Sequence, residues 1–193
     1  MKAEVDAKIA NGLDVFTTEA IQIEFIEWQN IEHLIIARSR GSEGVFIISD
    51  HQDRAVVIKA MVNPAHSFFA SQVLSYLGIR VPDQQVISTT DKFDEYKLLM
   101  HSVDWATKHH PANRGLAKQA FAKQLLLVQE YIPGLQVDKM TKERCTRFFN
   151  LTNLIDVGKT IVFDLALNNS DRFPIHQVWQ NANGNAFNMI FKV

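Results

Sequence analysis

Cysteine is almost missing from this sequence of 193 residues, and neither sign of charge predominates. Because Cys145 has no second cysteine to pair with, no internal disulfide can form, which fits a reducing compartment. The formal net charge of −1 provides no basic stripe for a nucleic-acid backbone and no polybasic segment for an anionic membrane. The sequence therefore predicts that neither nucleic acid nor a membrane is a partner.

Long apolar runs are missing too, and no stretch is long enough to span a bilayer. The first residues, MKAEVDAKIANGLD, carry acidic groups where an export signal has its apolar region. We therefore expect a cytoplasmic location. What the chain does have is 47% apolar residues, which is enough to build a core in one domain or in two small lobes.

Alternating apolar and polar residues predict strands in the first part of the chain. In the run FTTEAIQIEFIEW, which begins at Phe16, the apolar residues Ile21, Ile23 and Phe25 alternate with polar ones, as in a half-buried strand. Three more strand-like runs follow in close order, HLIIAR, VFIISD and AVVIKAM, separated by the polar turns SRGSEG and DHQD. These runs predict an antiparallel meander.

Helical spacing begins after the meander. A helix is predicted to start at Asn63 and Pro64 and to stop at Gly78. The run VPDQQVIS predicts another strand, a polar insertion over about 91–123 is predicted to be helical, and QLLLVQEYI predicts a last buried strand. After Pro133 the pattern is helical. The prediction is thus an α+β chain, with a sheet lobe over 1–132 and the start of a helical lobe over 133–193, an arrangement that can hold a nucleotide between its lobes.

The turn before VFIISD is the first candidate binding element. It contains Gly41, Ser42, Glu43 and Gly44 and leads into Val45. Glycines allow backbone N–H groups to approach phosphate oxygens closely, although Gly-Ser-Glu-Gly is also ordinary hairpin chemistry. One hairpin later, Lys59 ends the run AVVIK, where an ammonium group beside the glycine turn can neutralise phosphate charge.

A linker between the two lobes is the second candidate element. The last strand loses its alternation at Glu130, Tyr131 and Ile132 and ends at Pro133-Gly134. Backbone groups that are not bonded within a sheet can bind the edge of a purine base. We therefore expect main-chain contacts to the base from Glu130 and Ile132, although the pattern also fits a plain strand end.

Two polar residues near the end of the sequence are candidates for the chemical step. Asp171, where a predicted helix runs into the loop NNSDR, can accept the proton of an attacking hydroxyl. Asn188, at the start of a strand-like run, can offer a side-chain oxygen to Mg²⁺, with Asn169 or Asn185 as alternatives. Taken alone, Asn-Asn-Ser-Asp is also good turn chemistry.

These residues together resemble the actin-fragmin kinase family and, more distantly, the phosphoinositide lipid kinases. The resemblance runs from about residue 35 to the end and is carried by the motifs LGIRVP, QEYIPG, NNSDR and NMIF. It implies a kinase-like two-lobe fold, ATP and Mg²⁺ as cofactors, and transfer of phosphate to a serine or threonine. It also implies actin, presented in a complex with fragmin, as the substrate.

Two departures from the usual kinase pattern keep alternatives open. The segment 61–82 contains no acidic residue that could pair with Lys59, and the sequence stops at Val193 without the second metal-binding aspartate of kinases. A lipid or small-molecule kinase of the same fold is one alternative. A kinase-like binding module without catalytic activity is the other.

Overall fold

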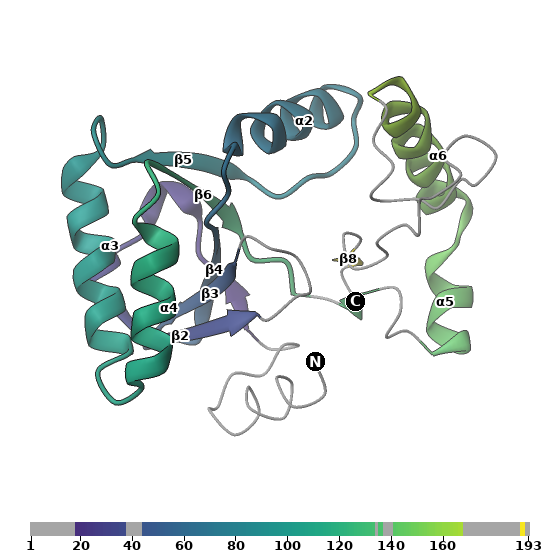
Figure 1. The fold of residues 1–193 in the computed structure, drawn as a ribbon. Helices are drawn as coiled ribbons and strands as arrows, with labels where there is room; N and C mark the ends of the chain where they lie inside the picture. Colours follow the sequence, from purple (N-terminus) through teal and green to yellow (C-terminus); the bar gives the residue numbers. More distant parts are fainter. Residues whose placement is uncertain (1–17, 38–43, 134, 137–140, 168–189, 192–193) are drawn as a thin grey trace. The chain divides into compact units, whose positions relative to one another are not determined.

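The computed structural model describes residues 18–37, 44–133, 135–136, 141–167 and 190–191. The chain divides into two compact units, which are considered separately here: Met1–Ser71 with Pro82–Pro133, and Gln72–Val81 with Gly134–Val193. An antiparallel sheet with helices beside it makes up the first unit, so the α+β class predicted from the sequence is confirmed (Figure 1).

The sheet of the first unit is built on the meander that the sequence predicts. Its strands are β1 (Glu19–Ala20), β2 (Ile31–Ala37), β3 (Val45–Asp50), β4 (Arg54–Lys59), β5 (Gln84–Ser88) and β6 (Leu125–Glu130). The order across the sheet is β2-β3-β4-β6-β5, with every neighbouring pair antiparallel. The short β1 adds a parallel pairing to the start of β4. Strand β4 is therefore central.

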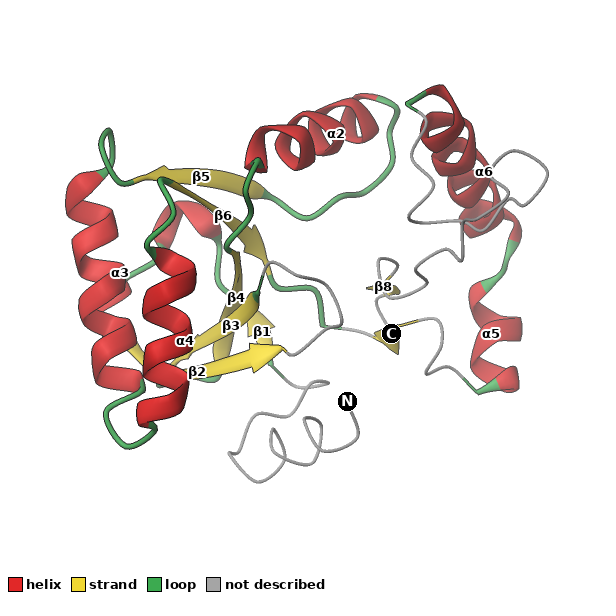
Figure 2. Cartoon of the chain, in the orientation of Figure 1, coloured by secondary structure: helices red, strands yellow, loops and turns green. Residues whose placement is uncertain are grey.

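Two helices cover one face of this sheet, and the main core lies between them and the strands. These helices are α3 (Phe93–Ala106) and α4 (Pro111–Phe121), which run side by side along the sheet (Figure 2). At the centre, the rings of Phe46 and Phe121 meet edge to face, with their centroids 4.7 Å apart. The core residues on this face come from both layers: Phe46, Ile48, Val56, Ile58, Leu99, Val103, Ala117, Phe121, Leu126 and Val128.

Hydrogen bonds tie the α3–α4 hairpin to the sheet. The hydroxyl of Ser102 donates to the carbonyl oxygen of Trp28, and the ammonium of Lys123 donates to the carbonyl oxygen of Ala60, just beyond β4. Between the segments of the hairpin, the hydroxyl of Tyr96 donates to the carbonyl oxygen of Phe121 over 3.2 Å. The hairpin is therefore an integral layer of the first unit.

The prediction of a continuous opening strand is wrong. After the two-residue β1, the chain forms two 3₁₀ turns, η1 (Ile23–Phe25) and η2 (Trp28–Asn30). Ile21 and Ile23 are buried, as the alternation suggested, but the Phe25 side chain is 68% exposed. Ile23 and Trp28 are buried within these turns without a ladder, so a period of two in the sequence did not require a strand here.

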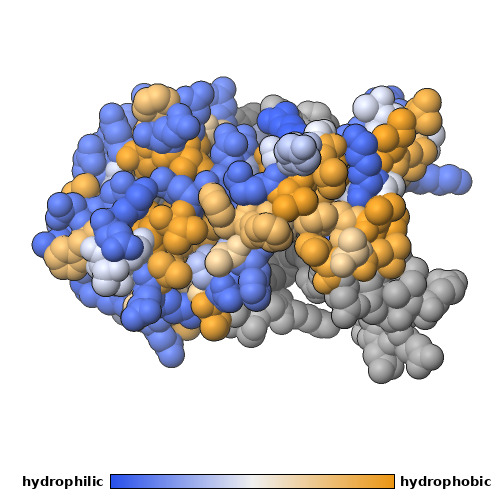
Figure 3. Space-filling model, turned by 90° about the horizontal axis from the view of Figure 1, so that it is seen from above, coloured by the Kyte–Doolittle hydropathy of each residue, from blue (hydrophilic) through white to orange (hydrophobic). Residues whose placement is uncertain are grey.

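Helix α2 (Pro64–Tyr76) starts and stops where the sequence predicts. Gly78 has φ of +73°, and its N–H donates to the carbonyl oxygen of Ser75 while the N–H of Ile79 donates to that of Leu74. These two bonds form a Schellman motif, which requires a left-handed residue after the helix and explains the glycine. Phe69 lies on the exposed face of α2. Figure 3 shows hydrophobic patches among hydrophilic ones on the face of the molecule that it presents.

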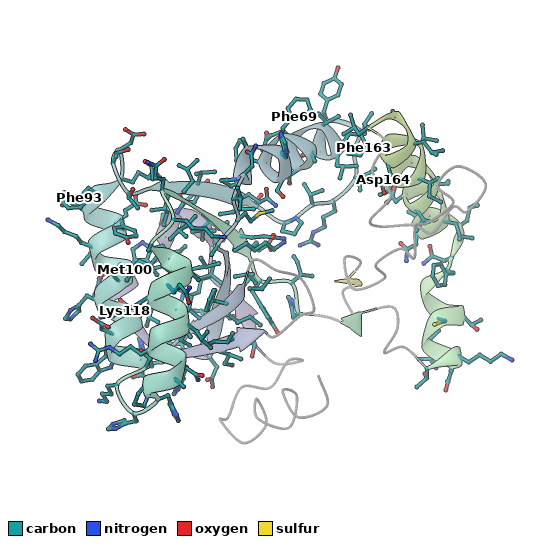
Figure 4. All side chains as sticks on the ribbon, in the orientation of Figure 1. Phe69, Phe93, Met100, Lys118, Phe163 and Asp164 are labelled. Carbon is teal, nitrogen blue, oxygen red and sulfur yellow. The ribbon has the colours of Figure 1, made fainter. Side chains whose placement is uncertain are left out.

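Besides the end of α2, the described part of the second unit contains two short strands and two helices. They are β7 (Leu135–Gln136) paired antiparallel with β8 (Ile190–Phe191), α5 (Lys142–Phe148) and α6 (Leu151–Ala166). The side chain of Asn150 caps α6 by accepting the N–H of Asn153, and near its other end α6 buries Phe163 and Asp164 (Figure 4). In the described ranges, no helix combines the length and apolarity needed to cross a membrane.

The turn between β3 and β4 is fixed by a buried carboxylate. Asp50 accepts the N–H groups of Gln52 and Arg54 at 2.9 and 3.0 Å and forms an ion pair with the Arg54 guanidinium at 2.7 Å. Burial by itself raises the pKa of Asp50, but the hydrogen bonds and charge of Arg54, together with the N–H of Gln52, outweigh it and hold the pKa below its ordinary value of 3.8. The ionised form is therefore favoured in the fold.

Replacing Asp50 by asparagine should lower the free energy of unfolding at pH 7 by about 1–3 kcal/mol, because the charge-assisted bonds are lost. Since the pKa is depressed in the fold, this contribution is present above about pH 3.8 and disappears as the pH falls through the folded-state value. Urea unfolding at pH 7 measures the loss of stability, and urea unfolding at pH 2 shows whether that loss disappears. The control is Asp53→Asn, since residue 53 is exposed and has φ of +57°, which asparagine tolerates. An equal loss for Asp50→Asn at both pH values would contradict the assignment.

Candidate active site

The sheet face opposite α3 and α4 carries the predicted phosphate-binding lysine. Side chains alternate along β4, and Val56 and Ile58 point into the core beneath α3 and α4. Ala55 and Val57 lie on the other face, in a smaller cluster with Ile47 and Tyr131. Lys59, two residues beyond Val57, therefore belongs to this second face.

The β3–β4 hairpin brings three of the predicted binding residues together. Val45 is the direct partner of Lys59 in the ladder, and the carbonyl oxygen of Gly44 accepts the N–H of Ala60 at 3.3 Å. Gly44 has φ of +74°, and a Cβ at this position would lie 2.9 Å from the Phe46 ring, which is packed in the core. Both constraints require glycine here. Gly41, Ser42 and Glu43 lie outside the described residues.

Lys59 is a cation in a poorly solvated place. Burial lowers the pKa of its ammonium group below the ordinary value of 10.5. Across the described residues, no acidic side chain forms an ion pair with it, which agrees with the lack of acidic residues in segment 61–82. An anionic ligand would supply the missing counter-charge.

The predicted linker leaves the sheet directly after β6. The N–H of Glu130 donates to the carbonyl oxygen of Asp83 at 2.8 Å, and the Glu130 carboxylate accepts the N–H of Asp83. The main-chain N–H of Glu130 is thus already hydrogen-bonded to Asp83. Within the described segments, by contrast, neither backbone group of Ile132 bonds to another backbone group. Ile132 is therefore the better placed of the two to bind a base.

Polar atoms that sequence reasoning missed lie on the same face as Lys59. The side-chain oxygens of Ser49, Gln84 and Gln129 are buried and have no hydrogen-bond partner among the residues that the structure describes. Ser49 lies opposite Ala55, and Gln129 lies opposite both Val57 and Gln84, so the sheet register puts all three on this face. The signal in the sequence was Gln129, a polar residue that interrupts the apolar run of the last strand.

The residues predicted for the chemical step, Asp171 and Asn188, lie outside the described residues, as do the alternatives Asn169 and Asn185. The described strand β8 begins after Asn188 in the sequence and pairs with β7, which follows the linker. In the portion that the structure describes, no group of three His, Cys, Asp or Glu could hold a metal ion.

Comparisons with known proteins confirm the family resemblance and the kinase-like fold predicted from the sequence. A family model described as "Actin-fragmin kinase, catalytic" matches residues 6–193. A protein of Dictyostelium discoideum, provisionally named as an actin-fragmin kinase, is 25% identical over 179 residues. The match covers 88% of this chain and 41% of that relative, so the chain spans about two fifths of the relative's length.

Proposed function

Because the chain belongs to the family of actin-fragmin kinase catalytic domains, we propose that it carries the ATP-binding part of an enzyme that phosphorylates actin in a complex with fragmin. The observation that carries the proposal is the position of Lys59 and its poor solvation. This poorly solvated cation lies next to Val45 and Gly44, on the sheet face from which the linker leaves. Such a cation gains most from the phosphates of a nucleotide.

Each residue of the proposed site has one role. The backbone of residues 41–45 and the ammonium of Lys59 hold the phosphates, and backbone groups of Glu130 and Ile132 hold the base. The oxygen of a serine or threonine hydroxyl bonds to the γ-phosphorus while the bond between that phosphorus and the bridging oxygen breaks, which releases ADP. Asp171 takes the hydroxyl proton.

The proposed site also has oxygen atoms that could bind magnesium. The side-chain oxygen of Asn188 and the phosphate oxygens are hard donors of the kind that Mg²⁺ prefers, and the ion would neutralise charge on the phosphates. The proposal also includes a cytoplasmic location, where ATP and actin are both present.

A kinase-like module that binds ATP without transferring phosphate is the second candidate. It is favoured by the absence, in the described ranges, of an acidic partner for Lys59. In kinases this pair holds the lysine in the position that catalysis requires.

Incubating the full-length protein with ATP labelled at the γ-phosphate, Mg²⁺, and either actin or the actin–fragmin complex tests the proposal. We expect label to enter actin, more in the complex than in actin alone, and Lys59→Met to lower the transfer by about 10²–10³-fold. Binding of ATP without transfer to any protein would favour the module. A full-length protein that binds no nucleotide would reject both functions.

A further inference from the structure

Two glutamines face each other across β5 and β6 with unsatisfied oxygens. Gln84 and Gln129 are direct partners in the ladder, so their side chains stand next to one another on the same face. The Oε1 atom of each is buried, and neither accepts a hydrogen bond within the described residues. Burying two carbonyl oxygens in this way costs free energy unless a donor is bound there.

The position of Gln129 relative to Lys59 suggests what that donor belongs to. Lys59 pairs with Leu127, two residues before Gln129 on β6. Gln129 and Lys59 are therefore diagonal neighbours on one face of the sheet, about 7–8 Å apart between backbones. On its other side, Gln129 directly precedes the linker that contains Ile132. The amide thus lies between the proposed phosphate cation and the proposed base-binding backbone.

The amide oxygens select for one kind of chemical group. An exocyclic amino group has two N–H donors and can satisfy two acceptors, whereas a keto oxygen has none and would add a third acceptor. The amide nitrogens of Gln84 and Gln129 are not among the buried unpartnered atoms, so it is the oxygens that are withdrawn from solvent. Adenine carries an amino group at position 6, where guanine and hypoxanthine carry a keto oxygen.

We propose that Gln129, with Gln84 beside it, determines base specificity by accepting hydrogen bonds from the 6-amino group of adenine, which makes the site select ATP over GTP. This inference rests on the proposed function, because it assumes that a nucleotide binds beside Lys59. It adds a side-chain contact with the base to the main-chain contacts expected from the linker.

The neighbouring Gln85 provides a matched control. It is a glutamine next to Gln84 on strand β5. Its partner across the ladder is Val128, which faces the core side of the sheet. Its side-chain oxygen accepts the ammonium of Lys92 at 3.3 Å. Removing the amide of Gln85 therefore tests the loss of a glutamine from β5 without touching the proposed base contact.

The experiment compares binding of ATP, GTP and ITP to the full-length wild type, Gln129→Met and Gln85→Met. Wild type and Gln85→Met should prefer ATP, and ITP should bind about tenfold more weakly because only the group at position 6 and the proton on N1 differ. In Gln129→Met, ATP should bind about tenfold more weakly and its advantage over GTP should shrink. The ITP comparison needs no variant, so it stands even if Gln129→Met fails to fold.

The possible failures are distinguishable. If the wild type binds none of the three nucleotides, the proposed function itself is wrong. If it binds ATP but binds ITP equally well, or if Gln129→Met keeps the full ATP preference, the kinase proposal stands and the role of Gln129 is wrong. In that case the two glutamines are a structural pair.

Discussion

Asp171→Asn should lower kcat by about 10²–10⁴-fold while the affinity for ATP stays within a few-fold. Asparagine keeps the size of the side chain but cannot accept the proton that the attacking hydroxyl loses. Because the proposed site binds the nucleotide through Lys59, the glycine turn and the linker, ATP binding should be nearly unchanged. Steady-state rates with actin–fragmin, together with direct measurement of ATP binding, separate the two quantities.

The control for Asp171 is Asp156→Asn on α6. Asp156 is a partly exposed carboxylate whose ion-pair partner is Lys159, at 3.6 Å, and it has no role in the proposed site. Its replacement should leave both kcat and ATP affinity unchanged. If Asp171→Asn loses ATP affinity in proportion to kcat, Asp171 acts by holding the metal-bound nucleotide and is not the base.

Lys59→Met should have two opposite effects, a loss of phosphoryl transfer of about 10²–10³-fold and a gain in stability of the protein without nucleotide. The loss follows from removing the cation that neutralises the phosphates. The gain follows because methionine keeps an apolar stem of similar length and removes an ammonium group that burial disfavours. Thermal unfolding and transfer assays on the same preparations measure both.

The pH dependence of the stability gain gives Lys59→Met a signature of its own. The folded-state pKa is lowered, so the penalty for the buried charge is full below that pKa and is relieved as the pH rises toward 10.5. The stability difference between variant and wild type should therefore shrink at alkaline pH. The control is Lys97→Met, which removes an exposed ammonium above the Phe93 ring, outside the proposed site. A variant that transfers phosphate normally would mean that another cation does this work.

Local patterns were enough to predict most of the sheet, and they failed where burial did not need a strand. The meander and the start and stop of α2 depend on neighbouring residues, so alternation, Pro64 and Gly78 revealed them. The opening run has the same alternation at Ile21 and Ile23, but its isoleucines are buried by 3₁₀ turns. The alternation of apolar residues alone does not distinguish a strand from such turns.

The contribution of the α3–α4 hairpin to the core could not be read from its composition. Leu99 and Val103 on α3 are four residues apart, as are Ala117 and Phe121 on α4, and each pair makes a narrow apolar stripe on an otherwise polar helix. The sequence therefore indicated a polar insertion. Only the packing against Phe46 revealed that these stripes close the core.

One part of the candidate site could be predicted from the sequence and another part could not. Gly44, Val45 and Lys59 could be predicted to meet because one hairpin holds them. The meeting of Gln84 and Gln129 could not, because it depends on the register between two strands that the hairpin separates in sequence. A shift of β5 by one residue in that register would have turned Gln84 to the core face, away from Gln129.

Strand β4 also has a consequence for how the chain folds as it is synthesised. One edge of β4 pairs with β3, which precedes it, but β1 covers only Arg54 and Ala55 on the other edge. The rest of that edge waits for β6, which leaves the ribosome only after α2, β5, α3 and α4. Until then the growing chain carries an unpaired apolar strand edge, the kind of surface on which nascent chains aggregate. Because Phe121, which packs against Phe46, directly precedes β6 in the sequence, we expect the core and the sheet to be completed together at a late stage. Nascent chains that end before Glu130 should therefore depend on chaperones.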